Sequence, residues 1–137
     1  MGQYHIAVNI DKRQYIDPYR FGDGGKLLDF GPAGHGMMLG LCALLARDDG
    51  GGGGDFLAHN PLVGSWAGDR ILIVGDYGRP GRDVTPEDIK AYQDQEHVSE
   101  TPDLYEAACA LFENVSDSIY AILCDYDNLK KHMRDPI

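Results

Sequence analysis

The sequence predicts an α+β fold, with a small, mainly antiparallel sheet from the N-terminal half and helices packed on one of its faces. Three observations lead to this prediction. Apolar residues alternate along residues 3–10, as in a strand with one buried face. A continuous apolar run at 70–74 has the length of a buried strand. After residue 85 the apolar spacing becomes that of helices, so the C-terminal half is expected to be mainly helical.

Three short strands are expected before the first helix. Residues 3–10 form the first strand, and residues 14–16 return beside it. Residues 26–30 are interpreted as the third strand. The run at 70–74 is expected to form an interior strand that is covered on both faces, with Ile73 inaccessible to solvent.

Four helices are expected, and capping residues mark most of their starts. The segment 37–47 is apolar nearly all round, so it should be a buried helix. Thr85 caps a second helix, with Pro86 in its first turn and acidic residues that oppose the helix dipole. The sequence Thr101-Pro102-Asp103 repeats this pattern before a third helix, and Ser116 is expected to cap the last one.

The chain has the size and composition of a single domain covering residues 1–137, with 43% hydrophobic and 25% charged residues. Five consecutive glycines predict a flexible loop at about 48–55. No apolar stretch is long enough to cross a bilayer, so no membrane association is expected. The three cysteines, Cys42, Cys109 and Cys124, form no close pair. They are expected to lie in apolar surroundings, which favours a reducing, cytoplasmic location.

Negative charge is concentrated in one part of the chain. The net charge is −10, and the segment 83–127 alone holds twelve acidic residues against a single base, Lys90. Such a field repels nucleic acid and favours a basic protein partner. The acidic residues expected to form the recognition surface are Asp83, Glu87, Asp88, Asp94, Glu96, Glu100, Asp103 and Glu106. The alternative is that this surface is only solvated.

A glycine-rich loop at 31–36 follows an acidic residue and precedes the apolar helix. This arrangement resembles the cofactor loop of S-adenosylmethionine methyltransferases, in which a helix N-terminus favours an anion. The glycine spacing is one residue off, and no series of alternating strands and helices follows. The alternative is a tight turn packed on the sheet. The candidate ligand residues are Asp29, Gly31, Gly34, His35 and Gly36.

Two Gly-Asp pairs flank the run at 70–74 and define a secondary candidate site. Functional groups often lie at strand ends, and the residues concerned are Trp66, Asp69, Arg70, Asp76 and Tyr77. The alternative is that the aspartates are turn residues and the tryptophan belongs to the core. The five histidines share no metal-ligand spacing, and no nucleophile motif is present. No catalytic residue, metal or cofactor is therefore predicted.

The sequence Gly64-Ser-Trp-Ala-Gly-Asp-Arg-Ile71, followed by Val74-Gly-Asp-Tyr77, resembles a motif in a group of small hypothetical proteins. These proteins are carried by bacteria, haloarchaea and their phages. The resemblance covers roughly residues 1–77 and implies an origin in a mobile element. The group has no assigned activity, so the resemblance implies no site residues.

The sequence is compatible with three hypotheses about function. The first is a non-enzymatic binding protein whose acidic surface engages a basic partner, such as a phage inhibitor of a nucleic-acid-binding defence complex, as anti-CRISPR proteins are. Its carboxylates would then occupy the place of phosphates. The second is a small enzyme, or a binder of a nucleotide or S-adenosylmethionine-type ligand, that uses the loop at 31–36. The third is an accessory or structural phage protein.

Overall fold

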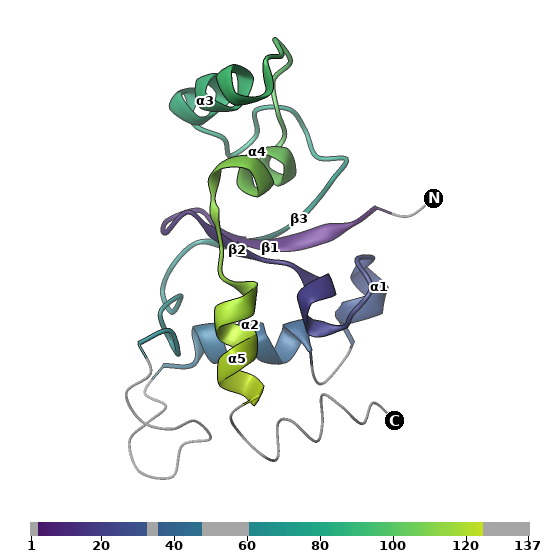
Figure 1. Cartoon of the computed structure of the whole chain (residues 1–137), viewed down its shortest axis with the longest axis vertical. Coiled ribbons are helices and arrows are strands. Elements are labelled where there is room, and N and C mark those ends of the chain that lie inside the picture. Colours follow the sequence, from purple (N-terminus) through teal and green to yellow (C-terminus); the bar gives the residue numbers. More distant parts are fainter. Residues whose placement is uncertain (1–2, 33–35, 48–60, 125–137) are drawn as a thin grey trace.

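A computed structural model describes residues 3–32, 36–47 and 61–124 (Figure 1). Its centre is a four-stranded sheet in the order β3-β1-β2-β4. The strands are β1 (His5–Asn9), β2 (Gln14–Ile16), β3 (Ile71–Gly75) and β4 (Glu113–Asn114). β1 pairs antiparallel with β2 and with β3, whereas β4 runs parallel to β2. The α+β class and the mainly antiparallel sheet are therefore confirmed. The expected loop at 48–55 lies outside the described residues.

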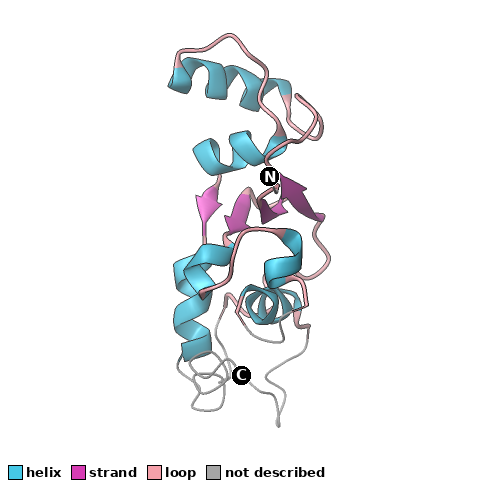
Figure 2. Cartoon of the chain, turned by 90° about the vertical axis from the view of Figure 1, so that its right-hand side faces the viewer, coloured by secondary structure: helices cyan, strands magenta, loops and turns pink. Residues whose placement is uncertain are grey.

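Helices cover both faces of the sheet, rather than the single face that the sequence predicted (Figures 1 and 2). The reason is that β1 is buried on both sides, since Ala7 and Val8 point to opposite faces and both have no exposed surface. The helices are η1, a 3-10 helix (Pro18–Phe21), α1 (Leu27–Phe30), α2 (Met37–Leu45), α3 (Pro86–Glu96), α4 (Leu104–Leu111) and α5 (Ser116–Cys124).

Each face of the sheet has its own apolar core. The larger core joins the sheet to α2 and α5 and includes Ile16, Phe30 and Trp66. The smaller core lies beneath α4, where Ile6 and Val8 contact Leu104 and Ala108. Helix α3 lies on the far side of α4 from the sheet, so it is the outermost element of that side (Figures 1 and 2).

Two strand predictions need correction. β3 is an edge strand and not an interior one, because β1 occupies the centre of the sheet. Ile73 is consequently 40% exposed, although it was expected to be inaccessible. The segment at 26–30 contributes one isolated bridge, between Tyr4 and Lys26, and then turns into the short helix α1.

The helix starts agree with the sequence only in part. Thr85 caps α3 as predicted, since its hydroxyl accepts a hydrogen bond from the Asp88 N–H. Asp103, and not Thr101, caps α4. Ser116 is the first residue of α5, and its hydroxyl accepts a hydrogen bond from the Asp17 N–H next to η1. Two of the three cysteines also differ from the expectation, because Cys42 and Cys109 are exposed, whereas Cys124 is partly buried.

Candidate functional site

The layer formed by α3 and α4 carries most of the predicted recognition surface. Six of the eight acidic residues proposed from the sequence are exposed; five lie on α3, on α4 or between them, and Asp83 lies in the loop before α3. The six exposed residues are Asp83, Glu87, Asp94, Glu96, Glu100 and Glu106. The other two, Asp88 and Asp103, are buried and were wrongly assigned to the surface.

Asp88 holds α3 to the turn between β1 and β2. Its carboxylate accepts a hydrogen bond of 2.6 Å from the guanidinium of Arg13, which also lies 4.6 Å above the centre of the Phe112 ring. The hydrogen bond from Arg13 holds the pKa of Asp88 below its ordinary value, against the opposing effect of burial. Asp88 therefore positions the acidic layer and is not available to bind a partner.

Asp103 caps α4 and fixes the loop that precedes α3. One of its carboxylate oxygens accepts the Glu106 N–H at 2.8 Å, and the other accepts the Gly78 N–H at 3.1 Å. Glu106 returns the contact, since its Oε1 accepts the Asp103 N–H. Burial raises the pKa of Asp103, and this effect outweighs the two backbone hydrogen bonds.

A groove of about 330 Å³ runs between α3 and α4. We call it the acidic groove, and it is lined by Tyr92, Glu96, Tyr105, Glu106, Cys109 and Ala110. Glu106 is held in place by the Asp103 N–H and by the Tyr92 hydroxyl, which donates to Glu106 Oε2 at 3.4 Å. The groove thus combines two carboxylates with two aromatic rings.

The pKa values of the two tyrosines reflect the burial and the negative charge of the acidic groove. Partial burial raises the pKa of Tyr92, and the negative charges of Glu106 and Glu96 raise it further. Burial also raises the pKa of Tyr105, to about 12. Both rings are therefore neutral at physiological pH in an electronegative setting, which suits a cationic group.

Cys109 offers no nucleophile, although it lines the acidic groove and part of it is exposed. Partial burial raises the pKa of the thiol to about 11, and the charges of Asp17 and Asp103 act in the same direction. The thiolate is therefore scarce at neutral pH, whereas a reactive cysteine needs a lowered pKa.

The secondary candidate residues lie at two separate places. At one end of β3, the Asp69 carboxylate accepts hydrogen bonds from Asn9 and Lys12, which lower the pKa of Asp69. At the same end, Arg70 forms an ion pair with Asp11 through two of its guanidinium nitrogens. At the other end, the Asp76 carboxylate accepts the Tyr4 N–H, and the Tyr77 side chain is exposed. Five strand residues separate the ends by roughly 20 Å, so these groups cannot act on one small ligand.

Trp66 belongs to the core, as the alternative interpretation proposed. It has no exposed surface, and its indole N–H donates to Gln14 Oε1 at 2.8 Å. This hydrogen bond satisfies the one polar atom of the side chain.

The glycine-rich loop was predicted to hold an anionic ligand at the start of α2. The start of α2 is already occupied by a carboxylate, because Asp23 Oδ2 accepts the Met37 N–H at 2.9 Å. Gly36 has a φ of 71°, and a Cβ there would lie 2.5 Å from the same oxygen. Asp29 is engaged with the Lys26 N–H. Gly31 follows α1 as its C-terminal residue, and Gly34 and His35 lie outside the described residues.

Comparison of the chain with protein-family models, curated proteins and solved structures gave no match. Within residues 3–32, 36–47 and 61–124, no group of three or more His, Cys, Asp or Glu side chains is placed to hold a metal ion. In the same part of the chain, no helix is both long and apolar enough to cross a membrane.

Proposed function

We propose that this chain is a small acidic binding protein that recognises a basic protein through the layer formed by α3 and α4. The acidic groove carries the proposal. A lysine or arginine side chain placed in it would meet the carboxylates of Glu96 and Glu106 and the faces of Tyr92 and Tyr105. Because Glu106 is already held in place, its charge is positioned before a partner arrives.

A protein that binds nucleic acid has the partner chemistry that the acidic groove requires. Its phosphate-binding surface is lined with lysine and arginine, and carboxylates can occupy the place of phosphates. An inhibitor of a nucleic-acid-binding defence complex, encoded by a phage or another mobile element, is the specific form of this proposal. The anion-binding alternative at α2 is less well supported, because Asp23 occupies that helix start.

The test compares two variants with equal change in net charge. The groove variant is Glu96→Gln with Glu106→Gln, since glutamine keeps the reciprocal cap of α4. The control variant is Glu87→Gln with Asp94→Asn, which neutralises two exposed acids of α3 that do not line the groove. A dye-labelled octalysine peptide is titrated with each protein in low salt, and binding is followed by fluorescence anisotropy.

We expect the groove variant to bind the peptide at least tenfold more weakly than the wild type, and the control variant less than threefold more weakly. Affinity capture from extracts of the cells that carry the gene should then retain the same basic proteins with the control and lose them with the groove variant. Equal weakening in both variants would show that charge acts only diffusely. Unchanged binding in the groove variant would reject the proposal.

A further inference from the structure

The outer edge of β3 is a second surface that can recognise a partner. β3 is the first strand of the sheet and pairs with β1 on one side only. The backbone hydrogen bonds at its ends show which residues face outward. The Asp76 N–H donates to Tyr4 O, and the Ile10 N–H donates to Arg70 O, so the residues at 70 and 76 face β1.

Hydrogen-bonding direction alternates along an antiparallel strand. The N–H and C=O groups of Ile71, Ile73 and Gly75 must therefore point away from β1. His5 supports this assignment, because it lies opposite Gly75 and its own N–H points the other way, to Gly25 O. Among the described residues, no backbone hydrogen bond from another segment reaches the three outward residues.

This edge lacks the features that usually protect a sheet edge. Natural proteins place charges, prolines or bulges on exposed edges to prevent another strand from pairing with them. The five residues of β3 are Ile, Leu, Ile, Val and Gly, with no charge, proline or irregularity of pairing. The edge can therefore accept a strand in extended conformation.

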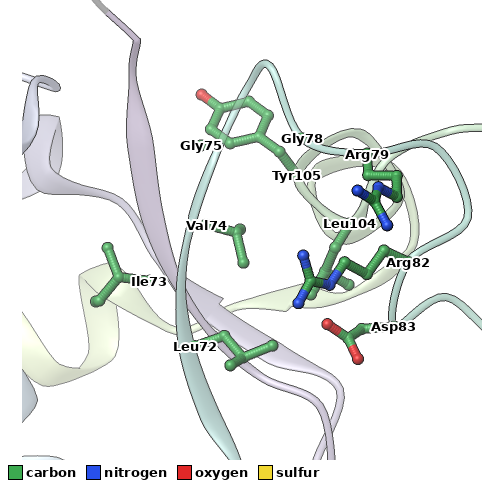
Figure 3. A pocket seen from close by; sticks show the side chains of 10 residues that line it. All are labelled: Leu72, Ile73, Val74, Gly75, Gly78, Arg79, Arg82, Asp83, Leu104 and Tyr105. Atoms are coloured by element: carbon green, nitrogen blue, oxygen red, sulfur yellow. The ribbon is translucent and has the colours of Figure 1, made fainter.

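A cavity of about 230 Å³ lies beside this edge, on the face of the sheet that α4 covers (Figure 3). Leu72 and Val74 form its floor together with Leu104 of α4. Arg79 and Arg82 come from the following loop, and the guanidinium of Arg82 points toward the two β3 side chains.

Positive charge at this cavity contrasts with the net charge of −10. Arg13, Arg20 and Arg70 each form an ion pair. In the described part of the chain, Arg79 and Arg82 have no such carboxylate partner within 4.0 Å. The cavity also contains Asp83, so one positive charge remains in excess.

We propose that the β3 edge and its cavity bind an extended acidic segment of a partner protein by strand addition. The backbone of the segment would pair with Ile71, Ile73 and Gly75. Its alternate side chains would face the cavity, where one apolar side chain would contact Leu72 and Val74. A carboxylate would pair with the two arginines.

A second copy of the chain suits this site less well than an acidic segment. Pairing β3 with another β3 would bring five uncharged residues to the edge and leave both arginines without a carboxylate. It would also bring together two molecules that each carry a charge of −10. The proposed site differs from the acidic groove in position and in the charge of its ligand, so either can fail without the other.

The experiment selects a displayed library of random octapeptides against the full chain. We expect the selected peptides to alternate valine, isoleucine or threonine with other residues and to contain aspartate or glutamate. When these peptides are synthesised, their affinity for the double variant Arg79→Gln/Arg82→Gln should be at least tenfold lower than their affinity for the wild type. Arg47→Gln, which removes an exposed arginine of another surface, should change binding less than twofold.

The location of binding is tested by nuclear magnetic resonance. A selected peptide should shift the amide signals of Ile71, Ile73 and Gly75 and slow their hydrogen exchange. Ile73→Pro removes one outward N–H at an edge position, where proline is tolerated, and should abolish binding. A peptide with N-methylated backbone amides tests the same hydrogen bonds without altering the protein, in case this variant does not fold.

Three outcomes would overturn the proposal. The first is a library that yields no peptide whose binding depends on Arg79 and Arg82. The second is a set of selected peptides that bind while the amide signals of β3 stay unchanged. The third is a dimer in sedimentation that binds no peptide and that Ile73→Pro converts to a monomer, which would show that a second copy occupies the edge.

Discussion

The ion pair between Arg13 and Asp88 offers a direct test of how the acidic layer is attached to the sheet. We expect Asp88→Asn to lower the free energy of unfolding by about 1–2 kcal/mol. A hydrogen bond to a charged group contributes about 1.5–3 kcal/mol. The Arg13 side chain is 48% exposed, so water screens the pair and the lower part of that range applies.

Urea unfolding of four proteins measures this contribution: the wild type, Asp88→Asn, Arg13→Gln and the double variant. Arg13→Gln should cost more than Asp88→Asn, because it also removes the contact of the guanidinium with the Phe112 ring. The double-mutant cycle separates the two effects, and we expect a coupling energy of about 1 kcal/mol. A coupling energy below about 0.3 kcal/mol would refute our account of the pair.

The pH dependence provides an independent check of the same pair. The pKa of Asp88 is lowered in the folded protein from its ordinary value of 3.8. The folded state therefore binds this proton less readily than the unfolded state, and the stabilisation is present above about pH 4. It is lost as the pH falls through the folded pKa. The wild type and Asp88→Asn should converge in stability as the pH falls, and a difference that grows in acid would contradict this explanation.

Two further predictions concern stability. Ile73→Ala should lower the free energy of unfolding by about 1–2 kcal/mol, because Ile73 is 40% exposed. Ile6→Ala should lower it by about 2–5 kcal/mol, because Ile6 is 2% exposed. Equal losses of stability in urea unfolding would contradict the edge position of β3. Asp103→Asn should lower the free energy of unfolding at pH 7 by about 1 kcal/mol, because asparagine Oδ1 still caps α4 but the amide nitrogen cannot accept the Gly78 N–H. Burial raises the pKa of Asp103 in the folded protein, so the protonated carboxyl stabilises the folded state below about pH 3.8, and this stabilisation is lost as the pH rises through the folded pKa. The stability of the wild type relative to Asp103→Asn should therefore increase in acid. Thermal melts from pH 3 to 7 would show the opposite trend if the charge of Asp103 stabilised the fold.

Local signals in the sequence predicted the strands and helices but not which elements pack or pair with one another. The alternation at 3–10 identified β1, and the Thr85-Pro86 pair identified the start of α3. The same alternation suggested one buried face, although every residue from Ile6 to Asn9 is buried. Whether a strand is central depends on pairing with distant segments, so the apolar run of β3 could not reveal that it lies at the edge.

The candidate site was predictable in its charge and not in its geometry. The concentration of acids was visible in the sequence, but the burial of Asp88 depends on Arg13, which is 75 residues away. For Asp103 a usable signal existed, since Glu106 follows it by three residues in the pattern of a reciprocal cap. Asp23 gave no signal, because the N–H that it accepts belongs to Met37, 14 residues further along the chain.

The two proposed surfaces differ in the sign of their charge, and this difference affects how their partners would approach. Beyond the Debye length of about 8 Å at physiological salt, most of the charge of −10 is screened, and what remains attracts a basic partner and repels an acidic one. At the cavity beside β3, Arg79 and Arg82 bring two positive charges against the one negative charge of Asp83. Under our proposal, the negative charge of the chain would attract a basic partner at long range, and the carboxylates of the acidic groove would bind it at short range. An acidic segment at β3 must overcome a general repulsion first, so its binding depends on backbone pairing and on the two arginines rather than on steering.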